Sequence, residues 1–215
     1  MKNIIPLLLL GIVLCNLEGV DVSTWDGYID WGAVKGEVDF AILRAGYGKG
    51  SVDDQWENNY NNGHDAGMKL GAYWYSYAYS EDDARNEAYG FMNAFSGKRL
   101  EFPVYYDIEE PGIYQAGVAN IIARAFCGVL EENRFYCGIY SSASFLEGYF
   151  ESDVLEKYAI WVAQWEVSWP TYGGQWGIWQ YTSEGTVSGI DDPADRDLAV
   201  IDYEPSIREN HLNGY

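Results

Sequence analysis

Residues 102–111 read FPVYYDIEEP, an apolar run that ends in three carboxylates and a proline. A short run of apolar, aromatic and β-branched residues closed by a turn residue is typical of a buried strand. Side chains alternate between the two faces of a strand, so Asp107 and Glu109 project to one side. The apolar Val104 and Ile108 project to the other side, where a helix would cover them. The segment therefore predicts a strand that delivers two carboxylates to the end of a sheet.

The same kind of run recurs on both sides of this segment and alternates with helical patterns. Each of the first five runs is followed by a helical stretch, whereas the later connections are short and rich in Gly, Trp and Pro. This order predicts an α/β protein with one barrel resembling the (β/α)8 type, simplified in its last third. The expected strands are residues 20–23, 40–45, 70–77, 104–109, 138–141, 159–164, 177–181 and 198–203. The expected helices are residues 30–35, 53–66, 81–95, 115–132 and 144–157.

Length and charge narrow the classes of function. The chain has 215 residues, 33 Asp and Glu against 13 Lys and Arg, and a formal net charge of −20. Its length fits one barrel domain, and we expect a monomer. Nucleic acids are not expected as partners, because affinity for phosphates rests on Lys and Arg.

Reactive side chains are few. The chain has two histidines, His64 and His211, and three cysteines, without the clustered ligands that a zinc site requires. We therefore expect no metal and no cofactor. Neither histidine sits in a context that indicates a Ser/His/Asp relay. The abundant functional groups are carboxylates, amides and aromatic rings, which are typical of proteins that handle sugars.

The N-terminal segment has a composition of its own. Residues 4–15 form an apolar run that follows Lys2 and is too short to span a bilayer stably. We interpret residues 1–18 as a signal peptide or apolar leader and residues 19–215 as the catalytic barrel. A secreted or extracellular protein is expected. An uncleaved leader that tethers the protein to a membrane is the alternative.

The carboxylate pair defines the candidate chemistry. Residues i and i+2 of a strand lie about 7 Å apart, so Asp107 and Glu109 can flank one glycosidic bond. Like charges this close raise one pKa, which leaves a protonated acid beside an ionised partner. Glycoside hydrolysis requires this division of roles.

Seven fragments, in this order along the chain, resemble the glycoside hydrolase family 25 lysozymes, the Chalaropsis-type muramidases. The resemblance runs from Gly19 to about Tyr203. It implies a (β/α)5(β)3 barrel that hydrolyses the β-1,4 bond between N-acetylmuramic acid and N-acetylglucosamine in peptidoglycan. Glycan strands of peptidoglycan would then be the partner. The fragments are GVDVSTWDGYIDW (19–31), VDFAILRAGYG (38–48), LGAYWYSYA (70–78), YYDIE (105–109), GIYSS (138–142), IWVAQW (160–165) and WGIWQYT (176–182).

The resemblance also implies catalytic roles. Glu109 matches the family's acid, and Asp107 matches the carboxylate that orients the substrate's acetamido group; direct attack by Asp107 is the rival mechanism. Asp21 and Asp197 match two supporting carboxylates. The sequence departs from the family near Asp197, because Ala199 stands where Asn is frequent. If Asp197 lies at the catalytic mouth, the last strand must run antiparallel to its neighbours.

Aromatic rings near strand ends are candidates for stacking on sugars. Gln180 is a further candidate for a polar contact with substrate. Arg44 either neutralises the carboxylate cluster or forms a structural ion pair. The aromatic candidates are Tyr47, Tyr77, Tyr140 and Trp165.

Other interpretations stay open at this stage. A barrel that binds wall glycans without cutting them, or a hydrolase of a related N-acetyl sugar polymer, would share much of this pattern. Cys127 and Cys137 approach each other where the chain reverses, and a disulfide there is compatible with an exported protein. Two buried thiols are the favoured interpretation, because the packed face of a helix favours small apolar groups.

Overall fold

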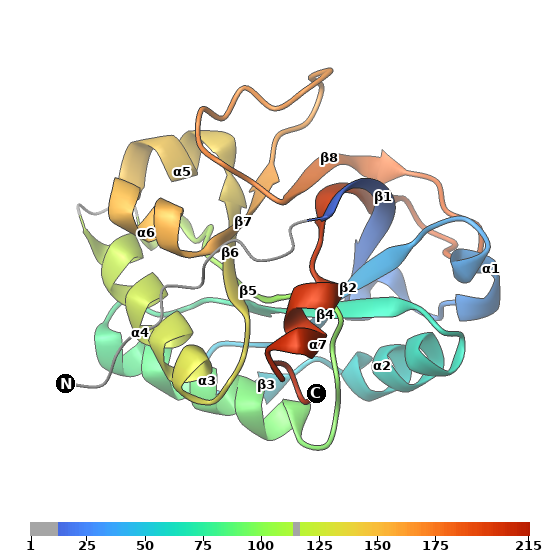
Figure 1. Ribbon diagram of the computed structural model, residues 1–215, viewed down its shortest axis with the longest axis horizontal. Helices are drawn as coiled ribbons and strands as arrows, with labels where there is room; N and C mark the ends of the chain where they lie inside the picture. Colours follow the sequence, from blue (N-terminus) through green and yellow to red (C-terminus); the bar gives the residue numbers. More distant parts are fainter. Residues whose placement is uncertain (1–12, 114–116) are drawn as a thin grey trace.

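The chain folds as a closed barrel, seen in a computed structural model that describes residues 13–113 and 117–215 (Figure 1). The sheet order is β1-β9-β8-β7-β6-β5-β4-β2-β3, and β1 also pairs with β2, which closes the barrel with eight strands and leaves β3 outside. This confirms the predicted TIM-like α/β architecture. The strands are β1 Val13–Val22, β2 Phe40–Tyr47, β3 Ser51–Val52, β4 Lys69–Tyr75, β5 Val104–Asp107, β6 Cys137–Ser142, β7 Ala159–Ala163, β8 Ile178–Gly185 and β9 Ala194–Asp202.

Strand direction follows the length of the connections. Consecutive barrel strands from β1 to β8 pair in parallel, and helices fill most of the crossovers between them. The short connection after β8 forms a hairpin, so β9 runs antiparallel to both β8 and β1. The last strand thus has the direction that a catalytic position for Asp197 requires.

The helices cover the outside of the barrel, as Figure 1 shows for α3 and α4. Helix α3 has the predicted bounds, and the Ser80 hydroxyl caps it by accepting from the Asp83 N–H at 3.2 Å. The expected helix over residues 144–157 is instead two helices, because Phe150 and Glu151 are extended. The helices are α1 Trp31–Lys35, α2 Trp56–Asp65, α3 Glu81–Phe95, α4 Val118–Glu132, α5 Ala143–Tyr149, α6 Ser152–Lys157 and α7 Glu204–Glu209.

The alternation of side chains produces two apolar clusters. Val104, Tyr106 and Ile108 belong to the outer cluster between barrel and helices, whereas Tyr105 belongs to the cluster inside the barrel. Phe40 and Phe102 stack inside with ring centroids 4.5 Å apart, and Ile207 of α7 joins the same cluster. Because these apolar groups fill the amino ends of the parallel strands, polar groups gather at the carboxyl ends.

Strand β1 begins earlier than predicted. It starts at Val13, within the segment that the sequence indicates as a leader, because β9 provides partners that pair Leu17 with Ala199 and Glu18 with Leu198. The Glu18 carboxylate also accepts from the Tyr181 hydroxyl at 2.9 Å. The first part of the apolar run lies outside the described residues. In the part of the chain that the structure describes, no helix has the length and apolar character needed to cross a membrane.

Other strand boundaries also differ from the prediction, and two of them bear on the site. Strand β5 ends at Asp107, so Glu109 lies two residues beyond it. Strand β9 begins at Ala194, four residues before the expected start, because the hairpin with β8 pairs Ala194 with Gly185.

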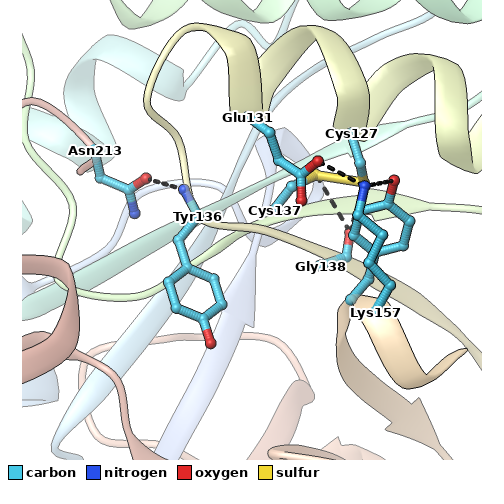
Figure 2. The surroundings of a disulfide bond; sticks show 8 residues. Cys127, Glu131, Tyr136, Cys137, Gly138, Lys157 and Asn213 are labelled. Atoms are coloured by element: carbon cyan, nitrogen blue, oxygen red, sulfur yellow. Dashed lines mark hydrogen bonds and ion pairs between the residues drawn. A yellow bond between two sulfur atoms is a disulfide. The ribbon is translucent and has the colours of Figure 1, made fainter. Parts of the chain in front are cut away.

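Cys127 and Cys137 form a disulfide that links the middle of α4 to the first residue of β6 (Figure 2). The favoured prediction of two thiols is therefore wrong. The chain turns back after α4 and brings the two Cα atoms to 5.5 Å, which suits a disulfide. Figure 2 also shows the ion pair between Glu131 and Lys157 beside the sulfur atoms, at 2.8 Å.

Removing this cross-link will lower the stability of the barrel. In a Cys15→Ala background, we expect Cys127→Ala/Cys137→Ala to reduce the free energy of unfolding by about 2–3 kcal/mol, because the open chain gains conformational entropy when it unfolds. Urea unfolding with and without dithiothreitol measures the effect. A midpoint that reductant leaves unchanged in the Cys15→Ala protein would contradict the prediction.

Candidate active site

A pocket of about 430 Å³ opens at the carboxyl ends of the parallel strands. This is the face on which barrels of this type carry their sites. Five of the residues predicted from the sequence line it: Asp21, Asp107, Glu109, Tyr140 and Gln180.

Asp107 lies on the floor of the pocket. It is the last residue of β5, and its carbonyl accepts from the Ser76 N–H at 2.9 Å, which fixes the strand end. Burial, reinforced by the negative charge of Glu109, raises its pKa well above the ordinary value, while Arg44 opposes the shift. Its Oδ1 is buried and has no hydrogen-bond partner among the described residues. This oxygen can accept a proton or an N–H from a ligand in the pocket.

Glu109 lies higher, at the opening of the pocket, where its side chain is exposed. The surrounding protein nevertheless displaces water and raises the pKa of Glu109, and the negative charge of Glu110 raises it further. Glu110 itself is held by the Tyr75 hydroxyl at 2.7 Å. Glu109 therefore combines access to solvent with a preference for the protonated form.

Asp21 in the pocket wall and Asp197 behind it form a second group of carboxyls. Burial raises the pKa of Asp21, and the charges of Asp197 and Asp195 add to the shift. Burial also raises the pKa of Asp197, which is fully buried and accepts from the Trp161 indole at 2.8 Å. Asp197 is thus close to the site without lining the pocket.

Asp195 and Trp25 are among the pocket residues that the sequence candidates do not include. Asp195 lies opposite Asp21 in the β1–β9 ladder, and burial raises its pKa to about 6. Trp25 is 79% exposed beside the pocket on a short 3-10 turn, Thr24–Asp26. The i, i+2 spacing of Asp195 and Asp197 could have identified Asp195 from the sequence, since both residues face the barrel interior. For Trp25 the signal is an indole directly after the first strand.

The other predicted aromatic residues surround the pocket without lining it. Tyr47 and Tyr77 are partly exposed and meet edge to face, with ring centroids 6.3 Å apart. Trp165 is half exposed on the connection between β7 and β8, which projects from the barrel in Figure 1. Its indole donates to Gln180 at 3.2 Å, and the Tyr140 hydroxyl donates to the same amide at 2.9 Å.

Arg44 forms a structural ion pair and also lies beside the carboxylate cluster, so both alternatives given for it from the sequence apply. Its Nε contacts the buried Asp53 carboxylate at 2.6 Å, and Asp53 also accepts from the Thr24 N–H at 3.1 Å, which anchors the loop that carries Trp25. Arg44 also lines the pocket and opposes the raised pKa of Asp107. Among residues 13–113 and 117–215, no three His, Cys, Asp or Glu side chains are arranged to hold a metal ion.

A barrel with two neighbouring carboxylic acids in an open pocket, one exposed and one buried, defines a glycoside hydrolase. Comparison with known families specifies the class further. The model of glycosyl hydrolases family 25 matches residues 20–190, and the chain belongs to this family.

Known lysozymes are similar to the chain. Lysozyme M1 of Streptomyces globisporus is 29% identical over 201 residues, which cover 84% of this chain and 67% of that protein. The autolytic lysozyme of Clostridium acetobutylicum is 28% identical over 182 residues, 84% of this chain and 55% of that protein.

Solved structures show the same fold. A bacterial lysozyme from Streptomyces coelicolor matches with a TM-score of 0.71 at 27% identity, over 85% of this chain and 91% of that one. The modular autolysin LytC from Streptococcus pneumoniae, solved with a synthetic peptidoglycan ligand, matches with a TM-score of 0.74 at 28% identity, over 85% of this chain. The chain spans 46% of that autolysin.

Because the buried acids have raised pKa values, we predict that the stability of the protein falls as pH rises. Asp21, Asp107, Asp195 and Asp197 keep protons in the folded state at pH values where the unfolded chain has released them. The folded state then binds more protons, so the free energy of unfolding falls as pH rises from about 4 through 6 and beyond. We expect urea unfolding to give a higher stability at about pH 5 than at pH 7.5.

Asp197→Asn tests whether the site causes this dependence. The variant keeps an acceptor for the Trp161 indole and removes one buried acid, so we expect it to gain about 1 kcal/mol at pH 7.5 and to flatten the pH dependence. Asp153→Asn is the matched control, since Asp153 is an exposed carboxylate paired with Arg124. A gain of the same size in both variants would assign the effect to net charge alone.

Proposed function

We propose that this protein is a lysozyme, a 1,4-β-N-acetylmuramidase that cuts between N-acetylmuramic acid and N-acetylglucosamine in peptidoglycan. The observation that carries the proposal is the position of Asp107 and Glu109 in one pocket, with a raised pKa at the exposed Glu109. Similarity to two named lysozymes supports peptidoglycan as the substrate.

Glu109 acts as the general acid. It lies at the pocket opening, within reach of a bound polymer, and its raised pKa favours the protonated form that a general acid needs. It protonates the glycosidic oxygen as the bond to the anomeric carbon breaks. The resulting carboxylate then takes a proton from the water that attacks the same carbon, which restores the acid.

Asp107 stabilises the positive charge that develops on the sugar. In our proposal the substrate's acetamido oxygen attacks the anomeric carbon, and the unpartnered Oδ1 of Asp107 accepts the acetamido N–H. This role suits a group on the pocket floor better than direct attack, because the Asp107 carboxyl is buried beneath the level of Glu109. Asp21 and Asp197 place two further carboxyl groups near Asp107.

The aromatic residues around the pocket bind the glycan. Tyr47, Tyr77, Tyr140 and Trp165 provide ring faces and polar tips for successive sugars. The substrate lies outside the cell membrane, and we propose export, directed by the apolar N-terminal segment, with the barrel acting as a monomer.

Glu109→Gln tests the chemical assignment. We expect release of soluble muropeptides from purified walls to fall by several orders of magnitude, because the amide cannot donate the catalytic proton. Mass spectrometry identifies the new reducing end, which must be N-acetylmuramic acid. Purified chitin as a second substrate distinguishes a hydrolase of a related polymer.

Glu110→Gln is the control for this variant, since it makes the same change in the next residue, and we expect it to keep activity within about tenfold. Equal wall binding with equally poor release by wild type and Glu109→Gln would show a binding barrel rather than an enzyme. A reducing end other than N-acetylmuramic acid would reject the muramidase assignment.

Glu110 also sets the upper pH limit of activity in this scheme. Its negative charge raises the pKa of Glu109, so neutralising it will make Glu109 lose its proton at lower pH. We expect the alkaline limb of the kcat/KM profile to move to lower pH in Glu110→Gln, by up to about one pH unit. An alkaline limb that stays in place would remove Glu109 as the group that titrates there.

A further inference from the structure

Gln180 joins three side chains of the candidate site: Asp21 on β1, Tyr140 on β6 and Trp165 on the connection between β7 and β8. It is 2% exposed on β8. Its Oε1 accepts from the Tyr140 hydroxyl at 2.9 Å and from the Trp165 indole at 3.2 Å, while its Nε2 donates to Asp21 Oδ2 at 2.8 Å. The polar atoms of its amide are therefore engaged within the protein, and Gln180 is better suited to position other residues than to bind sugar itself.

The orientation of this amide has a chemical cause. A hydroxyl can donate or accept, so Tyr140 alone fits either orientation of the Gln180 amide. An indole N–H can only donate, so Trp165 requires the amide oxygen on its side. The amide N–H then faces Asp21. Trp165 thereby favours the orientation in which Asp21 receives a donor, which an ionised Asp21 also requires.

The hydrogen bond from Gln180 favours the ionised form of Asp21. Burial and two neighbouring carboxylates raise its pKa, whereas the hydrogen bond from Gln180 lowers it. If the amide turned over, its oxygen would favour a protonated Asp21. The charged and titratable groups around Asp21 in the pocket and its wall are Asp195 and Asp197 on β9, Asp26 after β1, Arg44 on β2, Tyr73 on β4, Asp107 on β5 and Tyr140 on β6.

We propose that Gln180 is a positioning residue that holds Asp21 as a hydrogen-bond acceptor, and that the Trp165 indole N–H maintains this arrangement by fixing the direction of the Gln180 amide. The half-exposed Trp165 ring is also a surface on which a sugar can stack. One side chain thus connects a glycan contact at the rim to a buried carboxylate. The catalytic part of this inference rests on the proposed function; the hydrogen-bond part does not.

The first test measures Asp21 without substrate. The ¹³Cγ resonance of Asp21, assigned by its loss in Asp21→Asn, is followed against pH in wild type, Gln180→Met and Trp165→Phe. Met matches the size of Gln without the amide, and Phe keeps an aromatic ring without the N–H. Trp169→Phe is the matched control, because Trp169 lies on the same connection but packs against Trp176 and Trp179.

We expect the titration midpoint of Asp21 to rise by about one pH unit in Gln180→Met and by about half as much in Trp165→Phe. The midpoint should stay at the wild-type value in Trp169→Phe. Midpoints for Trp165→Phe and Trp169→Phe that both equal the wild-type value would overturn the inference. An equal rise in both variants would also overturn it, because the effect would then come from the loop and not from the N–H.

The second test measures the coupling between Trp165 and Gln180. It compares the rates at which the variants turn over soluble peptidoglycan fragments. We expect Trp165→Phe to lower kcat by about threefold to tenfold with KM changed less than twofold, since the ring remains. Trp165→Phe/Gln180→Met should be no slower than Gln180→Met alone, because both changes break one chain of hydrogen bonds. If the losses of kcat in the two single variants multiply in the double variant, the two residues act separately. If the wild-type protein turns over no peptidoglycan, the proposed function is rejected. The titration of Asp21 then remains the test of the hydrogen-bond chain.

Discussion

The pairing of β1 with β9 is the constraint on which both the barrel and its site depend. Strand β1 bonds to β2 in parallel and to β9 in antiparallel fashion, and the closed barrel requires both pairings. The β1–β9 ladder places Asp21 opposite Asp195 and Gly19 opposite Asp197. Barrel closure therefore brings acidic side chains together that lie more than 170 residues apart in the chain.

This concentration of acids opposes folding, and the rest of the barrel offsets it. Asp21, Asp107 and Asp197 are buried where ionisation is unfavourable, and Arg44 is the cation that lines the pocket among the described residues. The Trp161 indole donates to Asp197 and the Gln180 amide donates to Asp21, so two of these carboxyls are partly satisfied. The offsetting free energy comes from burial of the apolar clusters inside and around the barrel. Such sites are stable only because the remaining structure tolerates their cost.

Much of the site followed from local sequence patterns, and the rest required long-range pairing. Period-two alternation located Asp107 and predicted the faces of β5, and the helical pattern gave α3 with its exact bounds. The role of Asp195 depends on the register between β1 and β9, which no local pattern contains. The start of β1 at Val13 depends on the same register. The disulfide between Cys127 and Cys137 depends on how tightly the chain turns after α4, and residue types do not specify that distance.

The depth of each carboxyl in the pocket explains how similar groups can perform different tasks. Glu109 is exposed at the opening, so it can exchange protons with solvent and reach the leaving oxygen of a polymer that cannot enter the barrel. Asp107 lies beneath it, where exchange is hindered and an electrostatic contact with the sugar is strongest because water is excluded. Asp197 is fully buried and does not line the pocket, so in the proposed mechanism it acts through its neighbours and not by touching substrate. A general acid must regain a proton in every cycle, whereas a stabilising charge must not change, and the barrel separates these requirements by depth rather than by residue type.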